Sequence, residues 1–219
     1  MDIFQTAILA FIQGLTEFLP VSSSAHLVIF PKFFDWPDQG LAFDVVLHFA
    51  SLCAVIIYYR DSIAKLSQDF FSSISTRRIQ GDSLLAWGVL LGTIPVGLSG
   101  LFFNDFVKMN LRNFKVIAYA TIFFGIALGL SDMFHKSRGL SREVIRSSDI
   151  IIVGCFQALA LIPGTSRAGI TITAALLIGL SRKLSIKFAF LLSIPVITLA
   201  TIMKLFELSN ESQQVDWLF

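Results

Sequence analysis

Charged residues are scarce in this 219-residue sequence, and the scarcity excludes several classes of protein. Asp, Glu, Lys and Arg together make up 15% of the residues and hydrophobic residues 55%, which is far from the composition of soluble domains. The net charge of +2 argues against a nucleic-acid partner. The two cysteines, Cys53 and Cys155, both lie within apolar runs. A disulfide framework or a thiolate metal site is therefore not expected.

Long apolar runs are what the sequence has instead. Several are about 18 to 20 residues long, which is the length that crosses a bilayer as one helix. Clear spans are predicted at 41–59, 84–103, 114–133 and 188–206, with polar loops at 60–83 and 134–148. The chain is thus predicted to be an all-α, polytopic helical membrane protein that forms a single integral membrane domain over residues 1–219.

Two further apolar runs are interrupted by a proline and hydroxyl-bearing residues. The run 3–30 is broken at Pro20, and the run 149–180, too long for one crossing, is broken at Pro163-Gly164. Each is predicted to form a re-entrant pair of half-helices. Broken helices at membrane depth must line a protein-walled or watery cavity, so we expect the functional site at these breaks.

The two breaks also share a pattern, which predicts an internal repeat. Residues 19–25 and 162–168 both read apolar-Pro-x-hydroxyl-Ser-x-Ala. Three crossings separate them, so the second copy would enter from the opposite face, as in the inverted-topology repeats that build sites near the bilayer midplane. Repeat one would cover about 1–133 and repeat two about 149–219, the second C-terminally incomplete. Chance similarity over seven residues is the alternative.

Lys and Arg residues predict the orientation of the chain. They are concentrated in the segments 60–83, 134–148 and 181–187, which should therefore be cytoplasmic. The turns 31–40 and 104–113 would face outward.

Around the first break, an amide, a carboxylate, hydroxyls and an imidazole lie within 14 residues. Gln13 and Glu17 share a helical face, and a carboxylate with neutral oxygen ligands suits a hard cation such as Mg²⁺. A buried Glu bonded to a neighbouring helix is the alternative. Ser22 and Ser23 would bind an anion or merely cap the second half-helix. His26 would be a general acid or base, or structural.

Around the second break, an arginine lies among glycines and hydroxyls. Arg167 predicts a phosphate clamp because a guanidinium pairs bidentately with phosphate oxygens. The alternative is that it neutralises a buried carboxylate such as Glu17. Together the two breaks favour phosphoryl transfer. Asp44 and His48 would line the same cavity or pair with each other.

Charged residues near the ends of the predicted spans are most simply interfacial. Asp132 and Lys204 are both in this position.

The residues at the breaks resemble a family. Residues 13–26 resemble the (E/Q)-x-x-x-E signature and Ser-rich, His-ended loop of bacterial undecaprenyl-diphosphatases of the bacitracin-resistance type, and residues 163–171 resemble their P-G-x-S-R-S-x-x-T motif. The resemblance implies an inner-membrane enzyme that hydrolyses undecaprenyl diphosphate to undecaprenyl phosphate, the lipid carrier of peptidoglycan synthesis. It also implies dependence on Mg²⁺ or Ca²⁺ and an active site toward the outer face.

By motif position, the resemblance assigns a role to each site residue. Glu17 would be the essential acid, Ser23 the nucleophile, His26 its acid/base partner and Arg167 the phosphate clamp. Substrate binding would fall to Ser22, Gly164, Ser166 and Thr171. The metal would be held by Glu17 and Gln13, with Gln13 standing where some members have Glu.

The sequence differs from the family pattern at two motif positions and in length. Ala25 and Ala168 replace the usual Gly and Ser, and members normally continue for about two more helices, so the chain is expected to be a fragment or a truncated product. A homodimer is the oligomeric state to test.

A polyprenyl-phosphate transporter or flippase is the alternative function, although it leaves the clustering of Ser23, His26 and Arg167 unexplained.

Overall fold

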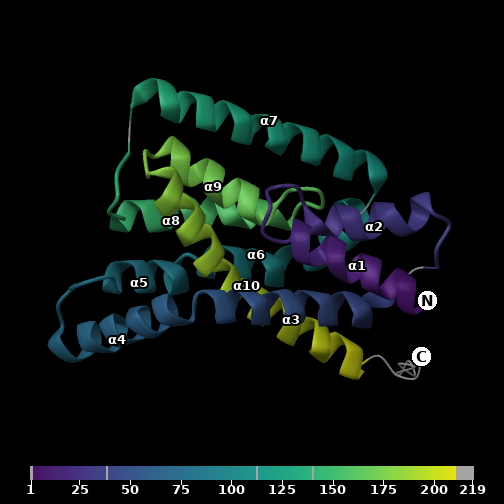
Figure 1. The fold of residues 1–219 in the computed structure, drawn as a ribbon, viewed down its shortest axis with the longest axis horizontal. Coiled ribbons are helices and arrows are strands. Elements are labelled where there is room, and N and C mark those ends of the chain that lie inside the picture. Colours follow the sequence, from purple (N-terminus) through teal and green to yellow (C-terminus); the bar gives the residue numbers. More distant parts are fainter. Residues whose placement is uncertain (1, 38, 112, 140, 211–219) are drawn as a thin grey trace.

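A computed structural model of the chain describes residues 2–37, 39–111, 113–139 and 141–210, and over these residues the fold is helical (Figure 1). The elements are α1 (Ile3–Thr16), α2 (Ser23–Phe33), α3 (Gly40–Tyr58), α4 (Arg60–Thr76), α5 (Ser83–Leu91), α6 (Ile94–Phe106), a π-helical turn (Val107–Leu111), α7 (Phe114–Arg138), α8 (Ser147–Ala158), a 3-10 turn (Leu159–Leu161), α9 (Arg167–Leu177) and α10 (Arg182–Asn210). The all-α prediction is confirmed.

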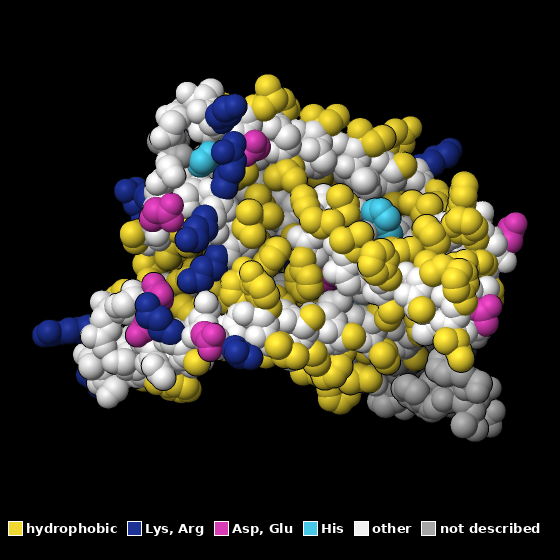
Figure 2. Space-filling view, in the orientation of Figure 1, with side chains coloured by type: hydrophobic (Ala, Val, Ile, Leu, Met, Phe, Trp, Pro, Cys, Tyr) yellow, Lys and Arg dark blue, Asp and Glu magenta, His cyan; other side chains and the backbone are white. Residues whose placement is uncertain are grey.

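Several helices are long and apolar enough to cross a bilayer. Among the described residues these are Ser83–Phe103, Phe114–Arg138 and Arg182–Phe206, with a fourth span if α3 and α4 count as one pair bent by 77°. Apolar side chains cover much of the surface between the ends of the molecule (Figure 2). A chain with these features is a multi-pass membrane protein.

The predicted polar loop at 60–83 is wrong over most of its length, because Arg60–Thr76 forms the helix α4. Ile63, Leu66 and Phe70 recur three and four residues apart, so they share one helical face. This face packs against α5, where the Phe70 and Trp87 rings lie 4.8 Å apart. The segment is an amphipathic helix, and its polar residues had concealed the apolar stripe.

The predicted loop at 134–148 begins later than expected, because α7 continues to Arg138. Gly139 then ends the helix with φ of +62°, the left-handed conformation that favours glycine at a helix C-terminus.

Both broken segments form pairs of short helices, as predicted. α1 packs on α2 around the buried Leu9 and Leu27, and α8 packs on α9. The first pair projects inward from the end of the molecule that carries the N-terminus, and the second from the opposite end, so that their connecting loops meet (Figure 1). The repeat bounds, 1–133 and 149–219, stay a prediction, and residues 211–219 lie outside the described part.

The loop between α8 and α9 is held by the main core of the protein. Val153, Phe188 and Leu192, from α8 and α10, are completely buried within this core. Gly154 packs directly on the backbone of Gly92, where an added Cβ would lie 2.9 Å from the carbonyl oxygen. This close contact fixes α8 against the junction of α5 and α6, and with it the position of the second break.

Candidate active site

The two connecting loops lie in direct contact although they are far apart in the sequence. The hydroxyl of Ser166 donates a hydrogen bond to the Leu19 carbonyl at 3.4 Å and accepts one from the Gly169 N–H at 3.1 Å. Ser166 is thus the N-cap of α9 and also the link to the first loop. The prediction that the two breaks meet is confirmed.

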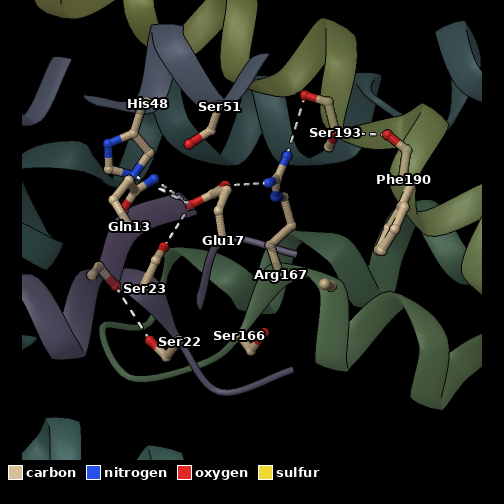
Figure 3. A network of polar contacts seen from close by, with 12 residues as sticks. Gln13, Glu17, Ser22, Ser23, His48, Ser51, Ser166, Arg167, Phe190 and Ser193 are labelled. Carbon is tan, nitrogen blue, oxygen red and sulfur yellow. Dashed lines mark hydrogen bonds and ion pairs between the residues drawn. The ribbon is translucent and has the colours of Figure 1, made fainter. Parts of the chain in front are cut away.

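Glu17 lies at this junction and is contacted from both loops (Figure 3). Its Oε1 accepts a hydrogen bond from Arg167 Nη2 at 2.5 Å, and its Oε2 accepts one from Ser23 Oγ at 2.5 Å. Gln13 Nε2 donates a further bond to Oε2 at 2.9 Å. A buried charge is costly unless it is paired and hydrogen-bonded. The ion pair with Arg167, one of the two alternatives for that residue, is present.

Arg167 is held on its other side by α10. Its Nη1 donates a hydrogen bond to the Ser193 carbonyl at 3.2 Å, so the guanidinium bridges the first loop and α10 (Figure 3). The side chain is only 14% exposed. This cation is therefore fixed in place before any anionic ligand arrives.

A cavity of roughly 350 Å³ opens beside this network. Glu17, Ser23 and Arg167 line it together with Asp44 and His48 of α3. The rest of the wall is largely apolar and includes Val45, Val96, Leu161, Val196, Ile197 and Ala200. A few convergent polar groups in an apolar pocket are typical of a small-molecule site, and an apolar wall suits a lipid.

Two helices begin at the cavity. α2 starts at Ser23 and α9 at Arg167, so the positive ends of two helix dipoles lie close to the cavity. Ser22, just before α2, has φ of +63°, a conformation that non-glycine residues rarely adopt. Such strain is concentrated at functional sites. The arrangement favours an anionic ligand.

The remaining substrate-binding residues predicted from the sequence lie around this centre. Ser22 lines the cavity, and its hydroxyl lies 3.3 Å from that of Ser24. The Thr171 hydroxyl instead donates to the Arg167 carbonyl at 2.9 Å, within the first turn of α9. Gly164 has φ of +94° and packs on α7, where a Cβ would lie 2.4 Å from the Ile117 carbonyl oxygen. Their roles toward a substrate stay predictions.

Comparison with known proteins identifies the family. The family described as "Bacitracin resistance protein BacA" matches residues 6–219. The chain belongs to the BacA family. An undecaprenyl-diphosphatase of Vesicomyosocius okutanii is 56% identical over 216 residues, covering 99% of this chain and 82% of that protein. Undecaprenyl-diphosphatase 2 of Stutzerimonas stutzeri is 51% identical over 219 residues, with 99% and 81% covered. An undecaprenyl-diphosphatase of Campylobacter concisus is 49% identical over 217 residues, again with 99% and 81% covered.

Two histidines of this BacA chain occupy different positions relative to the cavity. His26 Nδ1 lies 2.9 Å from the Ser22 carbonyl oxygen, and His26 is not among the described residues that line the cavity. His48 does line it, and its Nε2 lies 3.6 Å from Glu17 Oε2. The signal for His48 was its place one turn from Asp44 within an apolar span. The catalytic role predicted for His26 stays a prediction.

Glu17 and Gln13 are the residues predicted to hold a hard cation in this BacA chain. Within the described part there is no cluster of three or more His, Cys, Asp and Glu residues that could hold a metal. However, Gln13 Oε1 is buried and lacks a hydrogen-bond partner among the described residues. Carboxylate and amide oxygens are suitable ligands, and Mg²⁺ usually keeps several waters and binds substrate phosphate as well. The metal at Glu17 and Gln13 stays a prediction.

Proposed function

We propose that this chain hydrolyses undecaprenyl diphosphate to undecaprenyl phosphate and inorganic phosphate. One observation carries the proposal: the Ser23 hydroxyl is bonded to a Glu17 carboxylate that is itself paired with Arg167, all at one cavity. A hydroxyl nucleophile beside a base, with a fixed cation for phosphate charge, is what phosphoryl transfer requires. The names of the relatives support the same activity.

In the first step Ser23 Oγ attacks the terminal phosphorus. Glu17 Oε2 takes the hydroxyl proton, since it already accepts that hydrogen bond at 2.5 Å. The bond between the terminal phosphorus and the bridging oxygen breaks, and undecaprenyl phosphate leaves with the bonding electrons. Arg167 binds the phosphoryl oxygens as their charge increases. This hydrogen bond supports Glu17 as the base, and His26 Nδ1 lies 2.9 Å from the Ser22 carbonyl oxygen instead.

In the second step water replaces the serine. Glu17 first passes the serine proton to the departing undecaprenyl phosphate and is a carboxylate again. It then takes a proton from the attacking water, the bond between Ser23 Oγ and phosphorus breaks, Glu17 returns that proton to Ser23 Oγ, and inorganic phosphate leaves. Mg²⁺ or Ca²⁺, when held by Glu17 and Gln13, would neutralise phosphate charge.

The location proposed for this activity is the bacterial inner membrane, with the cavity accessible from the outer face. Lys and Arg side chains gather at the end of the molecule formed by α4 and the turns before α8 and α10 (Figure 2), which the positive-inside rule places in the cytoplasm. The α1–α2 pair enters from the opposite end (Figure 1). The homodimer stays a prediction.

Phosphate release from undecaprenyl diphosphate by the purified chain in detergent tests the function. We expect release with Mg²⁺ or Ca²⁺ and a loss of at least about tenfold with a chelator, measured as free phosphate over time. Detergent leaves no membrane to cross, so a transporter would release none. Absence of release with either cation, together with lipid movement in vesicles, would replace the hydrolase by the transporter.

A further inference from the structure

One wall of the cavity belongs to α10 and extends beyond Arg167. Ile197, Thr201 and Lys204 line the cavity and are spaced four and three residues apart, so they form one stripe along the helix. The stripe begins near the Ser193 carbonyl, which accepts the hydrogen bond from Arg167. Lys204 lies roughly 16 Å further along the helix axis at 1.5 Å per residue. The stripe therefore leads from the proposed catalytic centre to a second cation.

Thr201 has a buried hydroxyl that nothing in the described part of the chain satisfies. The residue is 8% exposed, and its Oγ1 has no hydrogen-bond partner there. By contrast, Thr198 on the same helix donates to the Ile194 carbonyl at 2.7 Å, as a helical threonine usually does. Buried polar atoms without a partner are rare and require an explanation. A ligand in the cavity would supply the partner.

The charges of the wall also favour an anion near Lys204. Arg167 and Lys204 are the only lysine or arginine side chains among the described residues that line the cavity. Asp44 adds a second carboxylate to the wall. Without Lys204 and without a bound cation, the side chains of the wall would carry a net negative charge, which disfavours a diphosphate.

We propose that Lys204 and Thr201 bind the lipid-attached phosphate, while Arg167 and Ser23 bind the terminal phosphate that is released. This assignment rests on the proposed function, whose substrate has two phosphates. The Cα–Cβ bonds of a helix tilt toward its N-terminus, which is the direction from Lys204 to Thr201 and Ile197. The neighbouring Ala200 offers an apolar surface to the first part of the lipid chain.

Product inhibition separates the two phosphate subsites. A polyprenyl monophosphate retains the lipid-attached phosphate, whereas inorganic phosphate corresponds to the terminal one. In Lys204→Gln we expect the inhibition constant of the monophosphate to rise about tenfold, as for a lost charge-assisted hydrogen bond, and that of inorganic phosphate to stay unchanged. Thr201→Val should show the same selectivity with a smaller rise. Equal effects on both inhibitors, or on neither, would overturn the assignment.

Control variants, and a binding measurement that does not depend on catalysis, complete the test of the subsite. Two control variants should leave both inhibition constants unchanged. They are Lys183→Gln, in the exposed first turn of α10, and Thr198→Val. If the wild-type chain releases no phosphate, the proposed function fails. Calorimetric titration with the monophosphate still tests the subsite, because weaker binding only in Lys204→Gln and Thr201→Val supports it. Equal affinity in all variants contradicts it.

Discussion

The Glu17 carboxylate is shared by side chains from four helices. Gln13 of α1, Ser23 of α2 and Arg167 of α9 donate hydrogen bonds to it, and His48 of α3 lies 3.6 Å away. One buried group thus holds the proposed nucleophile, Ser23, and the proposed phosphate clamp, Arg167, in place at once. A site assembled in this way is preorganised, which is the main source of electrostatic catalysis.

Ser23 is the residue whose removal reports most simply on the chemical step. We predict that Ser23→Ala lowers the rate of phosphate release by about 10³-fold or more, as for other lost nucleophiles. Brief reaction with a substrate labelled in the terminal phosphate should leave label on wild-type Ser23. Ser24→Ala is the control, because Ser24 lines the same cavity but has no hydrogen bond to Glu17 among the described contacts. Full activity in Ser23→Ala would show that water attacks directly.

At the scale of elements, the loop before α9 depends on a glycine that packs on α7. Gly164 combines φ of +94° with the close contact to Ile117, and Thr121 donates a hydrogen bond to the Gly164 carbonyl at 3.1 Å. We predict that Gly164→Ala destabilises the fold by about 1–3 kcal/mol through backbone strain alone, with more from the steric overlap. It should also lower activity because the loop carries Arg167.

Thermal unfolding in detergent and phosphate release measure these two effects of Gly164→Ala. Gly125→Ala, in the middle of α7, is the control, since an added Cβ there meets no atom within 4 Å. A normal unfolding midpoint and normal activity in Gly164→Ala would show that the loop does not depend on this contact.

The sequence was most informative about the two helix pairs that are interrupted by a proline. Pro20 and Pro163, each followed by hydroxyls inside an apolar run, predicted both helix pairs correctly, because an interrupted helix at membrane depth has few other solutions. The helix α4 was missed, since its apolar residues Ile63, Leu66 and Phe70 form a stripe rather than a run. A test for helical periodicity would have found it.

Within the site, residues that approach from distant elements were the hardest to predict. Lys204 was expected at the membrane interface, and its place in the lining of the cavity was not predicted. Which face of α10 meets the cavity depends on how α10 packs against α3 and α9, and a single sequence carries no record of that packing. The same holds for His48, whose distance to Glu17 depends on the position of α3 against α1.

At the scale of the molecule, the site lies where the connecting loops of the two helix pairs meet. Glu17 and Arg167 are 150 residues apart in sequence and enter with helix pairs that come from opposite ends (Figure 1). The connection between the pairs runs through α3 and α4 and then through Ser83–Phe103 and Phe114–Arg138, both long and apolar enough to cross a membrane. Folding of the whole helical domain is therefore needed to assemble the cavity.

The most direct test of the central claim compares two ion-paired carboxylates. Glu17→Gln keeps the side-chain shape but removes the base, and we predict a fall in the rate of phosphate release of about 10²- to 10⁴-fold. Asp132→Asn is the matched control, because Asp132 is also paired with an arginine, Arg182 at 2.6 Å, but its side chain is 44% exposed and does not line the cavity. It should retain activity close to wild type. Wild-type rates in Glu17→Gln, or equal losses in both variants, would contradict the assignment of this cavity as the active site.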